Sequence, residues 1–242
     1  MKRLAYKLLV AALGLTLLAG LLWLPPPGQP GGPVHEHVAA RYVEGGTEAA
    51  GAPNLTTAVL LNYRGLDTFG EVTVIFAALL AVLAVLGLGA AARNATGRET
   101  NKLRANARLP VSPVVNFIIR LMAPFMATFA AFVMIQGDVL PGGGFQGGVV
   151  LGAMMILLAV AIGPARVSGM VAPAPLGWLR ATAPLVFLIV AVSGLALSGA
   201  WFGLPDQPAP GHALMVVLEL AIGMGGAAVI TGIYLSLARE TE

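Results

Sequence analysis

The chain alternates between long apolar stretches and short polar ones. An α-helix rises about 1.5 Å per residue, so roughly 20 consecutive apolar residues cross a hydrocarbon core of about 30 Å. Six stretches approach or exceed this length: residues 4–24, 72–92, 114–135, 145–163, 182–202 and 212–238. We therefore predict an all-α, polytopic membrane protein with about six transmembrane helices.

The first apolar stretch follows Lys2, Arg3 and Lys7, so a cleaved signal peptide is the competing interpretation. Its end, Trp23 followed by Leu24 and three prolines, contains no small-residue cleavage site. We expect a retained helix, because the apolar stretch is longer than the apolar core of an ordinary signal peptide.

Composition supports a membrane protein and excludes several other classes. Hydrophobic residues make up 57% of the chain and charged residues 10%, too few to cover a soluble globule. The chain has no cysteine, which excludes disulfides and thiolate metal sites. Its net charge of +3 comes from basic residues at the ends of apolar stretches, so we expect the lipid bilayer as a partner and no nucleic acid.

The basic residues also predict the topology. With both termini in the cytoplasm, eleven of them lie inside: Lys2, Arg3, Lys7, Arg93, Arg98, Lys102, Arg104, Arg108, Arg166, Arg180 and Arg239. Only Arg41 and Arg64 then lie outside. This asymmetry is the one that the positive-inside rule requires.

Two polar stretches separate the first two apolar ones. Residues 25–53 are rich in proline and glycine and predict a solvated loop, although His35 and His37 beside acidic residues leave a weak metal-binding alternative. Residues 54–66 mix apolar and polar side chains and predict a short interfacial helix capped by Asn54. Residues 166–180 and 203–211 predict an inner loop and a proline-rich outer turn.

Three carboxylates stand at or within the predicted membrane helices. Asp67 and Glu71 are four residues apart, on one helix face at the mouth of the second stretch. They are either first-turn acids favoured by the helix dipole or an acidic entrance to an ion pathway. Glu219 lies about 10 Å along the last helix and must be protonated, paired, hydrated or ion-bound. It serves either packing or ion handling.

Arg120 is the only charged residue in the third apolar stretch, where Pro124 predicts a kink. An arginine near the end of a membrane helix can extend its charge to the interface, which is the interpretation we favour. The alternative is that Arg120 faces a polar interior and pairs with a carboxylate.

Residues 140–152 contain six glycines between the third and fourth apolar stretches. Gly142, Gly144 and Gly147 match the dinucleotide-binding pattern G-x-G-x-x-G, but the βαβ context and the downstream acidic residue of that motif are missing. We predict instead a tight loop between two membrane helices, with Asp138 beside it on the outer side.

Two stretches carry a family resemblance. The sequence L-P-G-G-G-F-Q-G-G-V-V-L, together with the later E-L-A-I-G-M-G-G, resembles the B subunit (MnhB/MrpB family) of Mrp-type multisubunit Na⁺/H⁺ antiporters over residues 109–242. It also resembles the counterpart of that subunit in membrane-bound hydrogenases and relatives of complex I. Upstream, L-N-Y-R-G-L-D-T-F-G-E-V-T-V resembles the MbhE module over residues 1–92. The family often has G-H-N-x-P where this chain has Gly137-Asp138-Val139-Leu140-Pro141.

The resemblance implies three parts: a two-helix MbhE-like module (1–92), a basic cytoplasmic linker (93–110) and a four-helix MnhB/MrpB-like module (111–242). It implies a membrane subunit of a Na⁺/H⁺ antiporter that helps to assemble and line the cation pathway. The alternative is an ion-translocating membrane-arm subunit of a membrane-bound hydrogenase or complex I-like complex. Either way we expect a transporter subunit without a cofactor, in the plasma membrane of a prokaryote, with Na⁺, H⁺ and other membrane subunits as partners.

The resemblance also implies roles for particular residues. The matching acids Asp67, Glu71 and Glu219 are the ion-pathway candidates. Arg120 and Asp138 are candidate supporting residues because of their charge, independently of the resemblance. The residues that shape the loop are Pro141, Gly142, Gly143, Gly144, Phe145, Gln146 and Gly147.

The predicted topology can be tested with epitope tags in intact cells. A tag inserted at residue 45 should react with antibody from outside, because the loop that contains it follows the first outward-running helix. A tag at residue 100 should react only after the cells are opened. Reaction of both tags from the same side would contradict the six-helix layout.

Overall fold

The computed structural model describes residues 2–24, 28, 31–32, 34–50, 52–95, 111–170, 173–203 and 208–240. These residues form helices and connecting turns, with no strand among them. Six helices are long and apolar enough to cross a membrane: Leu4–Leu22, Gly65–Gly87, Pro113–Ile135, Gly144–Ile162, Trp178–Leu197 and Gly211–Ala238. The predicted all-α membrane fold is confirmed. The side on which each terminus lies stays a prediction.

The chain divides into two compact units, Met1–Glu44 and Gly45–Glu242. The first contains α1 (Lys2–Leu22), a single apolar helix whose large side chains are exposed, and η1 (Val34–Val38), a turn of π-helix. α2 (Ala39–Ala50) crosses the boundary between the units. The prediction of a loop over residues 25–53 is wrong for this part, because the prolines lie at 25–33 and 53 and leave the helical segment free of them.

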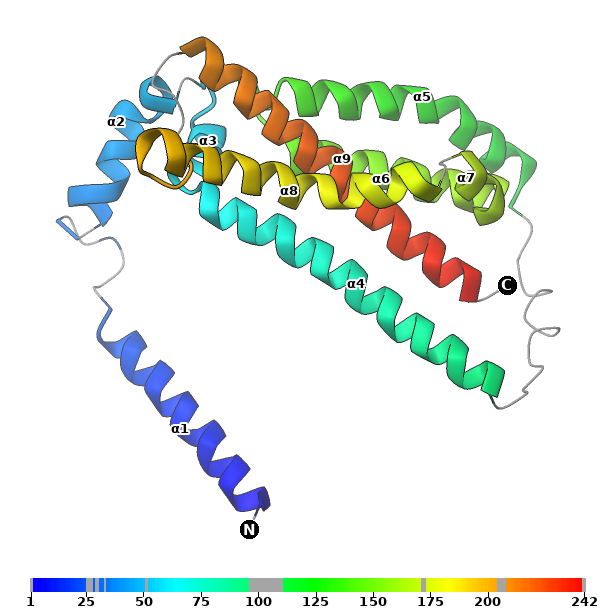
Figure 1. The fold of residues 1–242 in the computed structure, drawn as a ribbon, viewed down its shortest axis with the longest axis horizontal. Coiled ribbons are helices and arrows are strands. Elements are labelled where there is room, and N and C mark those ends of the chain that lie inside the picture. The colour runs from blue at the N-terminus through cyan, green and yellow to red at the C-terminus, as the bar shows by residue number, and fades with distance from the viewer. Residues whose placement is uncertain are drawn as a thin grey trace. The chain divides into compact units, whose positions relative to one another are not determined.

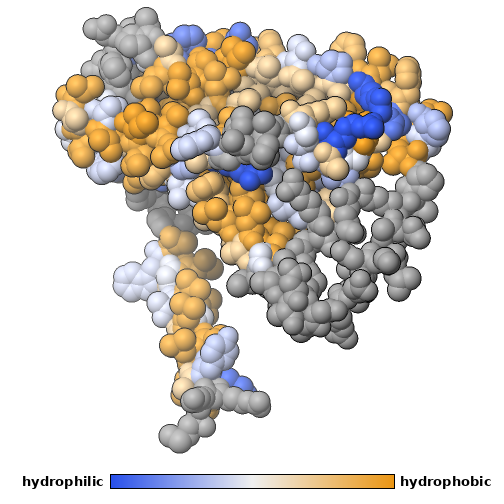
Figure 2. Space-filling view, turned by 45° about the vertical axis from the view of Figure 1, so that its right-hand side comes forward, coloured by the Kyte–Doolittle hydropathy of each residue, from blue (hydrophilic) through white to orange (hydrophobic). Residues whose placement is uncertain are grey.

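The second unit is a helical bundle built around α9 (Pro208–Glu240). Its other long helices are α4 (Gly65–Ala95), α5 (Pro113–Ile135), α6 (Gly144–Ile162) and α8 (Pro173–Ser198), all of which contact α9 (Figure 1). α9 is the most buried of the six candidate membrane helices. Figure 2 shows that much of the visible surface is apolar, as expected for a surface that faces lipid or other membrane subunits.

Glycines allow α6 and α9 to pack with their backbones in contact. A Cβ atom added to Gly148 would lie 2.7 Å from the carbonyl oxygen of Gly223, and one added to Gly223 would lie 2.7 Å from Cγ of Met134. Lipid tails are as apolar as the helices, so membrane helices associate through such close packing rather than through a hydrophobic driving force. The glycines therefore place α5, α6 and α9 close enough to build a common site.

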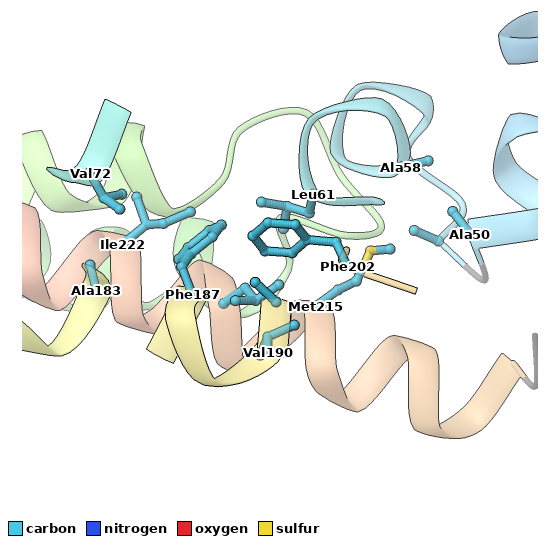
Figure 3. Close-up of a cluster of buried hydrophobic side chains, with 13 residues drawn as sticks. Ala50, Ala58, Leu61, Val72, Ala183, Phe187, Val190, Phe202, Met215 and Ile222 are labelled. Carbon is cyan, nitrogen blue, oxygen red and sulfur yellow. The ribbon is translucent and has the colours of Figure 1, made fainter. Parts of the chain in front are cut away.

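A cluster of buried apolar side chains holds the helices of the second unit together near the starts of α4 and α9 (Figure 3). The rings of Phe187 and Phe202 lie 6.1 Å apart and tilted by 60°. Phe202 also covers Gly65, at which a Cβ atom would lie 2.9 Å from the Phe202 ring. This contact fixes the start of α4 against the turn that follows α8.

Several predicted boundaries are wrong, and prolines explain one of them. Residues 166–180 are not a loop: α7 (Pro164–Met170) and the start of α8 occupy most of this range. Proline at a helix start costs nothing, because the first N–H groups have no intrahelical partner. Arg180 thus lies within α8, where its Nε donates to the carbonyl of Ala228 at 3.4 Å.

The other differences concern the ends of α4 and two connecting segments. The candidate membrane span in α4 begins at Gly65 rather than at residue 72, so Asp67 and Glu71 lie within it and not only at its mouth. Most of the predicted linker, residues 96–110, and residues 204–207 of the predicted outer turn lie outside the described residues. Pro124 lies inside α5, which continues through it, and its kink stays a prediction.

The predicted helix over residues 54–66 is confirmed, with Asn54 as its cap. It consists of α3 (Leu55–Ala58) and a turn of π-helix, η2 (Val59–Tyr63). Rather than lying only at an interface, this α3–η2 segment buries Ala58 and Leu61 in the apolar cluster. It therefore reaches the residues around Glu219.

Candidate functional site

Glu219 lies in α9 with its side chain buried, at 5% relative exposure. Its Oε2 accepts a hydrogen bond from the backbone N–H of Gly144, the first residue of α6. The first N–H groups of a helix have no partner in their own helix and carry a partial positive charge. The start of α6 is therefore suited to hold the carboxyl group of Glu219.

The loop between α5 and α6, residues 136–143, has no room for side chains where it meets this carboxyl; we call it the glycine loop. Gly142 and Gly143 have φ values of 130° and 145°, which side chains disfavour. A Cβ atom on Gly143 would lie 2.9 Å from Oε2 of Glu219, and one on Gly137 would lie 3.2 Å from Oε1. The glycines thus leave the space that the carboxyl group occupies.

Thr57 of the α3–η2 segment contacts the other carboxyl oxygen. Its Oγ1 lies 3.3 Å from Oε1 of Glu219 and 2.6 Å from the carbonyl oxygen of Gly137. A hydroxyl has one proton, so Thr57 donates to one of these acceptors at a time. When Thr57 donates to Gly137, a neutral Glu219 can donate to the Thr57 oxygen; an ionised Glu219 instead competes for the Thr57 proton. The site can therefore accommodate both charge states.

Asn54 holds the glycine loop against the α3–η2 segment. Its Nδ2 donates to the carbonyls of Gly137 and Leu140, each at 2.8 Å, and its backbone N–H donates to the carbonyl of Asp138 at 2.9 Å. Its Oδ1 accepts from the N–H of Thr56 at 3.0 Å, which is the capping bond. One side chain thus caps α3 and positions the loop that contacts Glu219.

A cavity of about 60 Å³ adjoins Glu219. Water occupies about 30 Å³ per molecule in the liquid, so the cavity has room for a few water-sized species. Polar side chains contribute part of its wall: Thr56, Thr57, Thr68, Gln146 and Glu219. The threonine and glutamine oxygens suit bound water or a small cation beside the carboxyl group.

A second buried carboxylate lies in the glycine loop. Asp138 is 1% exposed, and its Oδ2 contacts Nδ1 of His212 near the start of α9. Within the described part of the chain, neither carboxyl oxygen of Asp138 has a hydrogen-bond partner, so the contact with His212 is an ion-pair contact. Neither the role of His212 nor that of Thr57 is part of the sequence prediction. His212 carries a signal in its spacing, since it lies seven residues before Glu219, on the same helix face.

The structure does not bring the other two predicted acids to Glu219. Asp67 and Glu71 are exposed on α4, and neither lines the cavity. Asp67 lies in the first turn, as the helix-dipole interpretation requires, and accepts a hydrogen bond from Nε of Arg64 at 2.6 Å. Arg120 is exposed on α5 and makes no ion pair with a described carboxyl group.

The residues predicted to shape the loop have different surroundings in the structure. Phe145 and Gln146 line the cavity, whereas Pro141 is exposed. A Cβ atom on Gly147 would lie 2.8 Å from the carbonyl of Ala130, so this glycine serves the contact between α5 and α6.

Comparison with known proteins gives two family matches. Residues 114–237 match a family described as a domain related to the MnhB subunit of Na⁺/H⁺ antiporter, and residues 30–102 match MbhE, described as the E subunit of MBH. The chain is 27% identical over 183 residues to the A/B subunit of a probable K⁺/H⁺ antiporter of Rhizobium meliloti, which covers 70% of this chain and 18% of that protein. The chain thus spans less than a fifth of that relative.

Other relatives are similar over more of their length. An uncharacterized protein of Methanocaldococcus jannaschii is 25% identical over 203 residues, which cover 71% of this chain and 72% of that protein. A chain of the membrane-bound sulfane sulfur reductase, an archaeal respiratory membrane complex, has a TM-score of 0.67 and 28% identity, with 98% of both chains covered. A chain of the Mrp complex from Dietzia sp. has the same fold, with a TM-score of 0.64 and 20% identity, over 97% of this chain and 26% of that one.

The contacts of Asn54 can be tested by removing its side chain. Asn54→Ala removes two hydrogen bonds to the glycine loop, each of which stabilises the fold by about 0.5–1.5 kcal/mol. It should therefore lower the thermal unfolding temperature of the detergent-purified chain by roughly several degrees. Asn62→Ala is the matched control, because Asn62 makes no side-chain hydrogen bond with a described residue. Equal unfolding temperatures of the two variants would contradict the role given to Asn54.

Proposed function

Because the chain belongs to the family of proteins related to the MnhB subunit of Na⁺/H⁺ antiporters, we propose that it is a membrane subunit of a multisubunit monovalent cation/proton antiporter. The observation that carries this proposal is the buried Glu219 carboxyl group, held by Gly144 and Thr57 beside a cavity in a membrane-spanning bundle. Ionisable groups at such depth are costly and commonly mark ion or proton pathways.

Glu219 has the chemistry for exchanging a proton with a cation. In the neutral form its carboxyl group holds the proton and donates to Thr57. In the ionised form the carboxylate attracts a monovalent cation, which the oxygens around the cavity help to coordinate. A carboxyl group that holds the proton is neutral and attracts a cation only weakly. Binding of either ion therefore favours release of the other.

Asp67 and Glu71 do not line the cavity beside Glu219, so any ion site that they form is a separate one. Both are exposed on α4, so groups of a neighbouring subunit are needed to complete any ion site there. The exposed apolar helices of this chain are suited to contact such subunits within the bilayer. The proposed setting is therefore a larger assembly in a prokaryotic plasma membrane, with Na⁺ or another monovalent cation and H⁺ as its transported ions.

The second candidate is a membrane subunit of a redox-driven respiratory complex. It is favoured by the similarity to a chain of the membrane-bound sulfane sulfur reductase over 98% of both chains. In that setting the same Glu219 site would move ions, and other subunits would supply the redox chemistry. This chain has no cysteine to bind an iron–sulfur cluster through thiolates. Under both candidates it is a transporter subunit rather than a catalytic one.

The proteins that co-purify with the tagged, full-length chain distinguish the two candidates. After extraction from native membranes in a mild detergent, we expect membrane subunits of an antiporter and no stoichiometric iron or nickel. Mass spectrometry identifies the subunits, and elemental analysis measures the metals. Iron–sulfur or nickel proteins in equal amounts with the chain would move it to the redox-driven class.

Substitution of the acids tests whether they handle ions. In inverted membrane vesicles that contain the assembled complex, Glu219→Gln and Glu71→Gln should each lower cation-driven proton movement by about tenfold or more, because glutamine cannot release a proton. Glu48→Gln, at an exposed position of α2, is the control and should leave exchange unchanged. Normal exchange by both variants in intact complexes would refute an ion-handling role for these acids.

A further inference from the structure

Asp138 is buried without the donors that a buried carboxyl group normally has. Neither of its carboxyl oxygens has a hydrogen-bond partner among the described residues. Asn54 contacts the backbone of the same loop, but both of its side-chain donor bonds go to the carbonyls of Gly137 and Leu140. Buried polar atoms are almost always paired, and an unpaired carboxyl oxygen is costly. Hydrogen bonding within the described residues therefore gives no reason for an acid at this position.

The partner of Asp138 connects this buried group to the surface. Nδ1 of His212 contacts Oδ2 of Asp138, while the His212 side chain is 51% exposed. Imidazole gains and loses protons near neutral pH, and its two ring nitrogens allow it to take up a proton and pass one on. The pair therefore joins a group that can exchange protons with water to one that is shielded from it.

Asp138 also lies next in the chain to a residue that contacts Glu219. The preceding residue, Gly137, packs against the Glu219 carboxyl group and accepts the hydrogen bond of Thr57. His212 and Glu219 lie seven residues apart on one face of α9, and Asp138 contacts the first of them.

We propose that His212 and Asp138 form a proton-exchange pair that carries protons between the exposed start of α9 and the buried Glu219. The protonated ring of His212 gives the proton on Nδ1 to Oδ2 of Asp138, so an N–H bond breaks and an O–H bond forms. Asp138 passes the proton through water to Glu219 and becomes ionised again. The neutral His212 is then protonated from the aqueous side, and the net result is one proton moved from water to Glu219.

Among the described residues, Asp138 is the acid with which His212 makes an ion pair. α9 contributes His212 and Glu219, and Asn54 of the neighbouring segment meets the Asp138 backbone with a neutral N–H group. On α4, Asp67 is exposed and paired with Arg64. The inference rests on the proposed function in one respect, that Glu219 gains and loses a proton, and it adds the route by which the proton arrives.

Rapid mixing with infrared detection tests the route in the purified, intact complex. After a jump to lower pH, the carboxylic-acid band of Glu219 is identified by its absence in Glu219→Gln, and its rate of appearance is measured. His212→Ala should slow this rate by about tenfold or more, which is the lower range for loss of a proton-transfer group. Added imidazole should restore the rate, because the half-exposed position admits it.

Two further variants separate proton transfer from structural support. His212→Gln keeps a donor for Asp138 but carries no exchangeable charge, so it should slow the rate as His212→Ala does. His35→Ala removes an exposed histidine outside the second unit and should leave the rate unchanged, with or without imidazole. A wild-type rate in His212→Gln, or a slow His212→Ala that imidazole does not accelerate, would overturn the proposal.

The outcome also separates this proposal from the proposed function. If the Glu219 band depends on His212 in a complex without antiport activity, the proton pair stands and the antiporter assignment falls. If antiport depends on Glu219 while the band forms independently of His212, the antiporter assignment stands and the proton pair falls.

Discussion

The hydrogen bond from the N–H of Gly144 to the carboxyl group of Glu219 is the contact on which the second unit depends. Because bulk water is absent from the bilayer core, this carboxyl group needs partners that the folded chain provides. The start of α6 supplies it, but only where the intervening loop carries no side chains. The same bond therefore accounts for the consecutive glycines and for the close approach of α6 to α9.

The surroundings of Glu219 combine residues from both family matches. Asn54 and Thr57 lie in the region similar to MbhE, whereas the glycine loop, His212 and Glu219 lie in the region similar to MnhB. Asn54 and Thr57 together bond to the carbonyls of Gly137 and Leu140 and reach the Glu219 carboxyl group. In this chain the two regions thus form one site. Because they belong to one polypeptide, the chain itself links the Asn54–Thr57 segment to the glycine loop and Glu219.

Burial distinguishes acids that look alike in the sequence. Asp67, Glu71 and Glu219 all stand in or beside apolar stretches, yet only Glu219 is enclosed by the chain. Asp138, by contrast, follows an apolar stretch in a glycine-rich loop and resembles a surface residue, but it is 1% exposed. The number of apolar neighbours in the sequence therefore does not predict the solvent exposure of a carboxyl group, because exposure depends on which helices pack over it.

The sequence by itself determined the membrane class, the six long helices, the position of the glycine loop and the cost of an acid at Glu219, because each follows from hydropathy or backbone geometry over a few turns. It misplaced the starts of α4 and α8, since glycine and proline suit the first turn of a helix as well as a loop. Only the tertiary structure decided that Thr57 meets Glu219, 162 positions away, and that Asp138 meets His212. Hydropathy reports that a helix is buried in the membrane, whereas these contacts depend on which helix faces pack together.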